Sequence, residues 1–364
     1  MKSAATINSV AASAYRIPTD APEADGTFEW NATILVLAAV AAGDLTGIGY
    51  SYTSDAAVDV IHALQPYLVG LHAFDLPQAH EVMIGQVRNI GAPGLAATAI
   101  SALDAALWDL KGKMLGVSVQ KLLGQLRPEF ELYGSGGFTS YSDRQLQDQL
   151  GGWAAAGFSR VKMKIGRAAT SADEIGRIRI ARKSIGPEIE LFVDANGAYS
   201  RKQALAIAMG FRDLGVSWFE EPVTADDLAG LRLLRDRLNC QVAAGEYGYT
   251  TSYFKQMLSA EAVDVLQADA TRCFGITGFL GAATLCEAFH VPLSFHCAPA
   301  LHAAVGCSVP GLIHGEYFHD HARIEGMLFA EVPQPRNGRL RPDPERLGLG
   351  LEFKYSDAER YRIL

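Results

Sequence analysis

From about residue 131 onward, short apolar runs alternate along the chain with longer amphipathic stretches. Amphipathic stretches such as SDRQLQDQLGGWAAAG and SRKQALAIAMGFRDLG begin with Ser and end with Gly, as capped helices do. The apolar runs read as strands and occupy residues 131–137, 161–166, 191–196, 217–222, 241–247, 263–270, 291–298 and 311–318. Eight strand–helix units in succession predict an α/β fold, a (β/α)8 TIM-like barrel over residues 126–330.

The part of the chain before the barrel follows a different pattern. Three apolar stretches predict an antiparallel sheet at residues 7–17, 33–43 and 45–53, and helical stretches follow at 55–69, 76–89 and 94–114. This order predicts an α+β capping domain over residues 1–125. The segment 331–364 carries turn residues rather than a ninth unit, so we expect it to return to the capping domain.

The composition and net charge of the chain argue against several classes of protein. With 49% hydrophobic residues, 20% charged residues and a formal net charge of −8, the chain reads as a soluble globular protein without a basic surface for nucleic acid or anionic lipid. The longest apolar run, residues 32–42, is too short to cross a bilayer and lacks the basic start of a signal peptide, so we expect a cytoplasmic protein with no membrane partner. Five cysteines without a CxxC pair argue against a disulfide framework or a thiolate zinc site.

Three carboxylates recur at the same place in successive units. Asp194, Glu220 and Glu246 each come at the end of an apolar run, at equal intervals along the chain. In a parallel barrel the carboxyl ends of the strands share one rim, so the three acids should meet there. Converging carboxylates repel each other unless a cation joins them, and oxygen ligands with open positions suit Mg²⁺. Each acid alone reads better as a helix cap or a surface residue of a loop, but the matched spacing of all three favours a Mg²⁺ site.

The run RVKMKIG places two lysines on one face of a strand. Lys162 and Lys164 are two residues apart and therefore point to the same side. Taken alone, this pattern is typical of an edge strand with a solvated lysine face. Beside a bound cation, however, like charge and desolvation push a lysine toward its neutral form, which makes it a general base. We predict that Lys164, nearer the strand end, is the base and that Lys162 binds a substrate carboxylate.

Polar residues also end the last three predicted strands. Asp269 and His296 end adjacent strands, so the carboxylate can orient the imidazole and the pair can serve as a second acid or base. In a crowded acidic rim we expect Glu316 to retain its proton and to donate a hydrogen bond to a developing oxyanion. We expect His314, two residues earlier, to have a packing role. Together these groups fit removal of a proton alpha to a carboxylate, because the resulting enediolate needs strong electrostatic stabilisation.

The chain resembles the mandelate racemase subgroup of the enolase superfamily, the mandelate racemase/muconate lactonizing enzyme-like proteins. The resemblance covers nearly the whole chain and rests on VKMKIG, VDANG, FEEP, GE and QADATRCFGITG followed by FHCAP. It implies that Glu220 rather than Glu221 is the metal ligand, that Asn196 lies near metal and substrate, and that the protein is a homo-oligomer. The similar cycloisomerase and dipeptide-epimerase branch has a lysine on the sixth strand, where this chain has Asp269 followed by ATR, so we set that branch aside.

The sequence leaves two reactions open, dehydration of an acid sugar and racemisation of a 2-hydroxy acid. Residues 19–30 and 49–55, expected to be loops of the capping domain, are rich in acids, hydroxyls and tyrosines. This favours a polyhydroxylated acid as the small carboxylate substrate, with Tyr50 among its contacts. A non-catalytic barrel that binds sugar acids is a third interpretation, but it leaves the full set of base, metal ligands and His–Asp pair without a purpose. An amidohydrolase barrel needs an HxH pair on its first strand, and ELYGSGG has none.

Overall fold

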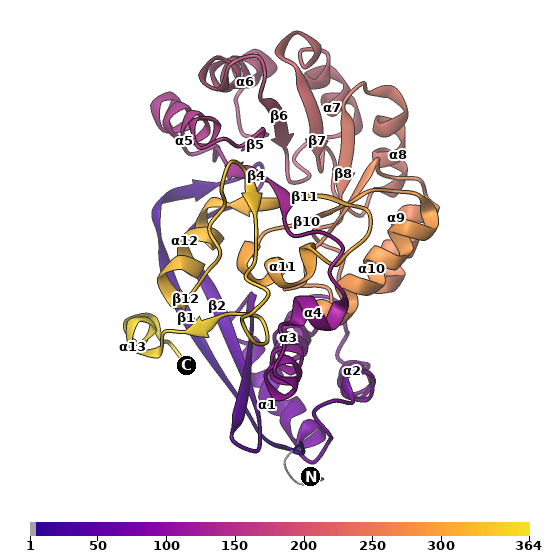
Figure 1. The fold of residues 1–364 in the computed structure, drawn as a ribbon. Coiled ribbons are helices and arrows are strands. Elements are labelled where there is room, and N and C mark those ends of the chain that lie inside the picture. The colour runs from indigo at the N-terminus through magenta and orange to yellow at the C-terminus, as the bar shows by residue number, and fades with distance from the viewer. Residues whose placement is uncertain (1–4) are drawn as a thin grey trace.

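The computed structural model describes residues 5–364 and contains the predicted barrel (Figure 1). Its strands are parallel neighbours in chain order, and the last pairs with the first through Gly315 and Leu132, which closes the barrel. They are β4 (Phe130–Gly136), β5 (Arg160–Lys164), β6 (Glu190–Asp194), β7 (Val216–Glu220), β8 (Gln241–Ala244), β9 (Val265–Ala268), β10 (Leu293–Phe295) and β11 (Leu312–Phe318). Each overlaps the apolar run predicted for it, so the predicted (β/α)8 fold is confirmed.

Helices cover the outside of the barrel. They are α5 (Asp143–Ala155), α6 (Ser171–Ile185), α7 (Arg201–Ala208), the short 3-10 helix η1 (Arg212–Leu214), α8 (Leu228–Arg237), α9 (Thr251–Ser259), α10 (Gly275–Phe289), α11 (Pro299–Gly306) and α12 (His319–Leu328). The serines predicted to start two of them are true caps. The Ser142 and Ser200 side chains each accept a hydrogen bond from the N–H of the third residue of the helix, and the Gln145 and Gln203 side chains accept one from the N–H of the cap residue. These reciprocal bonds satisfy N–H groups that would otherwise lack partners.

A three-stranded antiparallel sheet covered by helices forms the capping domain. Its elements are β1 (Ile7–Ala24), β2 (Glu29–Ala42), β3 (Leu45–Tyr52), α1 (Ala57–Leu68), α2 (Leu76–Val87), α3 (Leu95–Leu115) and α4 (Val119–Leu123). Helix α3 packs closely against β3. A Cβ atom added at Gly49 of β3 would lie only 2.3 Å from the Ala102 carbonyl oxygen of α3. The first four residues of the predicted domain lie outside the described residues.

The hairpin of β1 and β2 is longer than the sequence pattern indicated. Residues 19–30 were predicted as a loop, but β1 continues to Ala24 and β2 begins at Glu29. Contact with the barrel orders this end of the hairpin, since the Thr139 hydroxyl donates to the Ala24 carbonyl oxygen at 3.0 Å. In Figure 1 the indigo hairpin runs from the capping domain past α12 to the barrel. Residues with acidic and hydroxyl side chains favour turns when only their local sequence is considered. In this hairpin, contacts with distant parts of the chain hold such residues in strands.

After the barrel the chain returns to the capping domain. The returning segment holds β12 (Phe329–Ala330), β13 (Arg339–Leu340), β14 (Glu352–Phe353), α13 (Tyr355–Ala358) and η2 (Glu359–Tyr361). Strand β13 first pairs antiparallel with β4. Further on, the Leu349 N–H donates to Asp109 of α3 at 2.7 Å, and the Ala14 N–H of β1 donates to Leu364 at 3.2 Å. The last residues therefore lie against the capping sheet.

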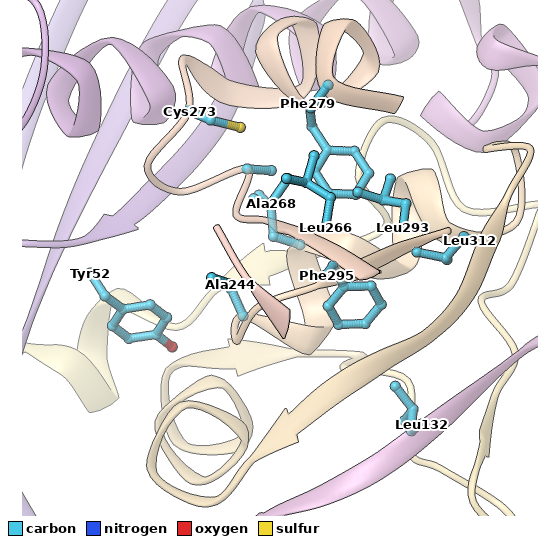
Figure 2. Close-up of a cluster of buried hydrophobic side chains, with 14 of the residues drawn as sticks. Tyr52, Leu132, Ala244, Leu266, Ala268, Cys273, Phe279, Leu293, Phe295 and Leu312 are labelled. Atoms are coloured by element: carbon cyan, nitrogen blue, oxygen red, sulfur yellow. The ribbon is translucent and has the colours of Figure 1, made fainter. Parts of the chain in front are cut away.

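Apolar side chains fill the barrel below its catalytic end and pack its strands against the helices. The interior layer consists of Tyr133, Phe192, Trp218, Ala243 and Val265. Phe192 and Trp218 each precede a strand-end acid by two residues, so they point to the same side and lie one layer beneath it. Figure 2 shows part of the outer core, where Phe279 of α10 lies beside Leu266 and Leu293.

No helix among residues 5–364 is both long enough and apolar enough to cross a membrane.

Candidate active site

The structure brings the three predicted metal ligands together. Asp194 and Glu220 are the last residues of β6 and β7 and are paired in the sheet register, and Glu246 follows β8 by two residues. One oxygen of each lies within 4.8 Å of the other two, and all three side chains are buried. Glu246 Oε2 has no hydrogen-bond partner. Three buried carboxylates, one with an oxygen that accepts no hydrogen bond, form an all-oxygen donor set that fits a hard divalent cation.

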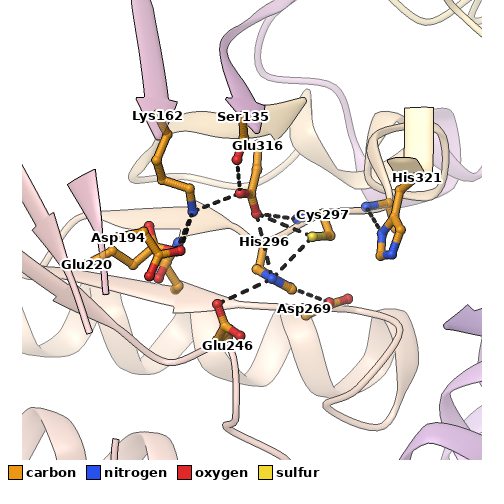
Figure 3. Close-up of polar contacts among 12 residues, drawn as sticks. Ser135, Lys162, Asp194, Glu220, Glu246, Asp269, His296, Cys297, Glu316 and His321 are labelled. Atoms are coloured by element: carbon orange, nitrogen blue, oxygen red, sulfur yellow. Dashed lines mark hydrogen bonds and ion pairs between the residues drawn. The ribbon is translucent and has the colours of Figure 1, made fainter. Parts of the chain in front are cut away.

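Both lysines of RVKMKIG lie inside the barrel. Because β5 is flanked by β4 and β6, and Lys162 is completely buried, the alternative of a solvated edge strand is wrong. Lys162 contacts Glu220 and lies 2.7 Å from Glu316 (Figure 3). Lys164 contacts Asp194. Burial alone would lower the pKa of each lysine, but these carboxylates outweigh it and raise both pKa values. The lowered pKa expected for Lys164 requires a cation at the acids, and it stays a prediction.

His296 and Asp269 form the predicted pair. Asp269 follows β9 directly and His296 follows β10, and the His296 Nδ1 lies 2.7 Å from Asp269 Oδ2. Thr271 fixes the carboxylate from the other side, through its backbone N–H and its hydroxyl, each at 2.7 Å. Burial alone would raise the pKa of Asp269, but the hydrogen bond and charge of His296 lower it. A carboxylate held ionised in this way orients the imidazole through its Nδ1.

The expected protonated state of Glu316 is not supported. Glu316 lies in β11 between two basic side chains, Lys162 at 2.7 Å and His296 at 3.7 Å, rather than among acids alone. Burial alone would raise the pKa of Glu316, but Lys162 and His296 lower it well below its usual range. Its neighbours are donors, since the Ser135 hydroxyl and the Cys297 N–H both donate to it, at 2.5 and 3.0 Å. Glu316 is therefore an acceptor that holds Lys162 and the turn after His296 in place.

Sequence reasoning missed Ser135, Glu221, Arg272 and Cys297, four further residues of the site. The Cys297 Sγ lies 3.1 Å from His296 Nε2, and Arg272 lies 3.4 Å from Glu246 Oε1 and 3.8 Å from Asp269 Oδ2. Ser135 was detectable, because it is a polar residue one position before the end of the first barrel strand. Cys297 was not, because its side chain reaches the site through a left-handed backbone conformation, φ 51°, that the sequence does not indicate.

Asn196 lies between the acids and an open cavity. Its backbone N–H donates to Asp194 Oδ1 at 2.9 Å, and its own Oδ1 is buried without a partner. The cavity has a volume of about 600 Å³ and is lined mainly by polar and aromatic side chains, among them Thr27, Glu221, Thr224, Tyr247 and Tyr249. Thr27 comes from the turn of the β1–β2 hairpin, so the capping domain contributes to the wall of this cavity.

Two residues named from the sequence lie away from this cavity. Tyr50, in the segment 49–55, belongs to β3 rather than to a loop, is 1% exposed, and donates its hydroxyl hydrogen bond to Glu325 of α12 at 2.5 Å. The Tyr50 hydroxyl thus has its partner between the capping domain and α12, away from the cavity, and a contact with the substrate stays a prediction. His314 is buried in the barrel interior and packs 5.3 Å, centroid to centroid, from Trp218, in keeping with the packing role expected for it.

Fold and site together define an acid–base centre with a carboxylate cation site at the mouth of a capped (β/α)8 barrel. The family model described as enolase C-terminal domain-like matches residues 145–358, and the one described as mandelate racemase/muconate lactonizing enzyme, N-terminal domain, matches residues 16–124. The chain belongs to the mandelate racemase/muconate lactonizing enzyme family of the enolase superfamily. The resemblance of its motifs to this family is thereby confirmed.

Relatives of this chain include enzymes that act on acid sugars. A mandelate racemase/muconate lactonizing enzyme-like protein from Rubrobacter xylanophilus is 47% identical, with a TM-score of 0.95 over 98% of this chain and 100% of that one. The L-talarate/galactarate dehydratase of Salmonella typhimurium is 30% identical over 84% of this chain and 76% of its own; its structure with Mg and L-lyxarohydroxamate has a TM-score of 0.90. The 3,6-anhydro-alpha-L-galactonate cycloisomerase of Streptomyces coelicolor is 30% identical over 85% of this chain and 86% of its own.

Proposed function

We propose that this protein is a Mg²⁺-dependent dehydratase of acid sugars. The observation that carries the proposal is the position of the three converging acids between two potential proton-transfer groups. Lys164 contacts Asp194 on one side, and the His296 Nε2 lies 3.4 Å from Glu246 on the other. A substrate carboxylate drawn to this place would have its alpha carbon between an amine and an imidazole, which is the arrangement that proton removal and proton return require.

Asp194, Glu220 and Glu246 would hold the Mg²⁺, with oxygen ligands of the kind that the ion prefers. When bound, the ion supplies positive charge that stabilises the enediolate anion of the substrate. At an effective dielectric constant of about 20, one pair of unit charges at about 4 Å contributes about 4 kcal/mol, or roughly three decades in rate. Several such contacts are needed, and Lys162 adds another because its ammonium group would bind the same carboxylate.

The chain's own residues carry the proton transfers. Lys164 takes the proton from the alpha carbon, and the electron pair of the broken C–H bond forms the enediolate. His296, held in one orientation by Asp269, then gives its proton to the hydroxyl group on the beta carbon, which leaves as water. The enol so formed becomes the 2-keto acid by proton transfer to carbon. Strands β5 and β10 are separated in the barrel by β4 and β11, so Lys164 and His296 approach the substrate from different sides.

A polyhydroxylated substrate fits the cavity beside Asn196. Its wall offers the hydroxyls of Thr27, Thr224 and Tyr249 and the carboxyl of Glu221, whose Oε1 is buried without a hydrogen-bond partner. Buried groups of this kind favour ligands that return hydrogen bonds, because an apolar ligand would leave them unpaired. The relationship to the talarate/galactarate dehydratase of Salmonella typhimurium points to the same substrate class.

Racemisation is the second candidate, because a lysine and a histidine on different sides of one carbon can remove and return a proton on opposite faces. Cycloisomerisation is a further candidate, because the Streptomyces coelicolor relative is a cycloisomerase. However, the residue that follows the sixth barrel strand of this chain is Asp269 and not lysine. The cytoplasmic location and the homo-oligomeric state stay predictions.

The test is incubation of the protein with Mg²⁺ and a library of acid sugars and 2-hydroxy acids in D₂O, followed by NMR. Loss of water with formation of a 2-keto acid supports the proposal. Stereoinversion with deuterium uptake and no loss of water would replace it with the racemase, and ring opening of a lactone or anhydro sugar would replace it with the cycloisomerase. No change in any compound would favour a barrel that only binds sugar acids.

A further inference from the structure

Outside the catalytic centre, a second cluster of metal-ligand side chains joins the capping hairpin to the barrel. Asp20 and Glu23 belong to β1, and His319 is the first residue of α12. The His319 Nε2 lies 2.9 Å from Asp20 Oδ2. One ligand atom from each of the three residues lies within 4.8 Å of the other two. The three side chains therefore converge, although 299 positions of sequence separate Asp20 from His319.

Glu23 supplies an independent sign that a ligand belongs there. Its side chain is 1% exposed, and its Oε2 accepts a hydrogen bond from the Trp30 indole at 2.8 Å. Its Oε1 is buried and has no hydrogen-bond partner. A carboxyl oxygen left unpaired in a buried place is unfavourable unless a proton or a cation is bound nearby. Glu23 also lines a surface cavity of about 390 Å³.

Neighbouring charges do not neutralise this carboxyl group. The nearby guanidinium of Arg323 is bound to Asp320 at 2.6 Å, and the other oxygen of Asp320 accepts from Thr33 at 2.5 Å. The Arg323 guanidinium is thus paired with Asp320, and no ion pair among residues 5–364 involves Glu23. A buried carboxyl group without a cationic partner favours a bound cation.

We propose that Asp20, Glu23 and His319 form a Zn²⁺ site that ties the capping hairpin to the barrel. One imidazole nitrogen and two carboxylate oxygens are common Zn²⁺ ligands, and a water molecule completes the tetrahedral set. The imidazole distinguishes this site from the all-oxygen cluster of the catalytic centre, which suits Mg²⁺. Because β1 belongs to the capping domain and α12 follows the barrel strand that carries Glu316, the bound ion joins the two parts of the molecule beside the catalytic centre.

Zn²⁺ binding to the full chain is measured by titration calorimetry in saturating Mg²⁺, and Co²⁺ in place of Zn²⁺ reports tetrahedral coordination by its visible absorption. His319→Gln and Glu23→Gln are the test variants, and Asp20→Asn, at an exposed residue, is a third. His62→Gln is the matched control, because His62 is an exposed histidine on α1, away from the cluster. Counting equivalents matters, because His296, Cys297 and Glu316 also place ligand atoms within 4.8 Å of one another.

We expect each test variant to lose one equivalent of Zn²⁺, or to bind it at least tenfold more weakly, while His62→Gln binds like the unchanged protein. We also expect Zn²⁺ to raise the melting temperature of the unchanged protein and of His62→Gln, but not of His319→Gln. Variants that bind as many equivalents as the unchanged protein with the same affinity would overturn the proposal, as would an unchanged protein that binds no Zn²⁺. Neither result bears on the proposed dehydration, which is measured with Mg²⁺ alone.

Discussion

The Nδ1 atom of His296 lies 2.7 Å from Oδ2 of Asp269, inside hydrogen-bond distance and buried from solvent. The two residues follow neighbouring strands, β9 and β10, and no other acid contacts the Nδ1 side of the ring among the ion pairs of residues 5–364. In the proposed mechanism, Asp269 therefore holds the ring so that Nε2 faces the substrate.

Asp269→Asn should uncouple the two proton transfers. The amide keeps the size of the side chain but removes the charge that stabilises protonated His296, so dehydration should slow by about 10²- to 10⁴-fold. Lys164 is unaffected, so exchange of the alpha proton with D₂O should continue at a rate closer to that of the unchanged protein. NMR measures both rates in one sample. If the variant dehydrates its substrate at the normal rate, Asp269 has only a structural role.

Lys164→Ala and Glu246→Gln should fail for different reasons. Lys164→Ala removes the base, so turnover should fall below detection while the three acids still bind Mg²⁺. Glu246→Gln leaves the lysine in place but removes one charged ligand, so Mg²⁺ affinity should fall at least about tenfold. Calorimetric titration with Mg²⁺ separates the two effects. Full turnover in Lys164→Ala would remove that residue from the mechanism, and unchanged Mg²⁺ affinity in Glu246→Gln would remove the proposed ligand.

Stability should depend on pH through Glu325 of α12, which contacts the capping strand β3 and helix α11. Burial raises the pKa of Glu325 to about 8 from 4.5, although hydrogen bonds from the Tyr50 hydroxyl and the Ala300 N–H oppose the shift; Asp269 adds to it. The folded protein thus keeps a proton that the unfolded chain releases above pH 4.5. This contribution to stability is complete below about pH 4.5 and is lost as the pH rises through about 8.

Glu325→Gln should flatten that dependence, because the amide cannot ionise. The difference in unfolding free energy between the variant and the unchanged protein should grow in favour of the variant from pH 5 to pH 8, by on the order of a few kcal/mol. Urea unfolding at a series of pH values measures it. Parallel curves for the two proteins would show that Glu325 is ionised in the folded state.

Gly49→Ala should weaken the capping domain. A Cβ atom there would lie 2.3 Å from the Ala102 carbonyl oxygen and 2.4 Å from the Ala106 nitrogen, so β3 and α3 would have to separate. We expect a loss of about 3 kcal/mol or more in unfolding free energy. Gly152→Ala is the matched control, because this exposed helical position has open space around it and alanine should stabilise it by roughly 0.5 to 1 kcal/mol. Equal stability of the two variants would contradict the close packing of β3 and α3.

Residues at strand ends were the most predictable part of the site. Asp194 and Glu220 could be placed side by side from the sequence, because parallel strands of one barrel end at one rim and side chains two apart point the same way. The same geometry brought Lys162 and Lys164 into the barrel. Residues beyond a strand end escaped this reasoning. Glu246 was predicted only because it continues the regular spacing of Asp194 and Glu220 along the chain. The position of the Cys297 side chain depends on a backbone turn with positive φ.

By itself, the sequence determined the order of strands and helices and the residues at the mouth of the barrel, because hydrophobic periodicity and parallel pairing act locally and repeat. Only the tertiary structure decided the ionisation of Glu316, since its pKa depends on Lys162 and His296, which come from other strands. The same holds for the length of the capping hairpin and for the meeting of Asp20 with His319. Electrostatic energies depend on distances in space, and for residues far apart in the chain only the folded backbone sets those distances.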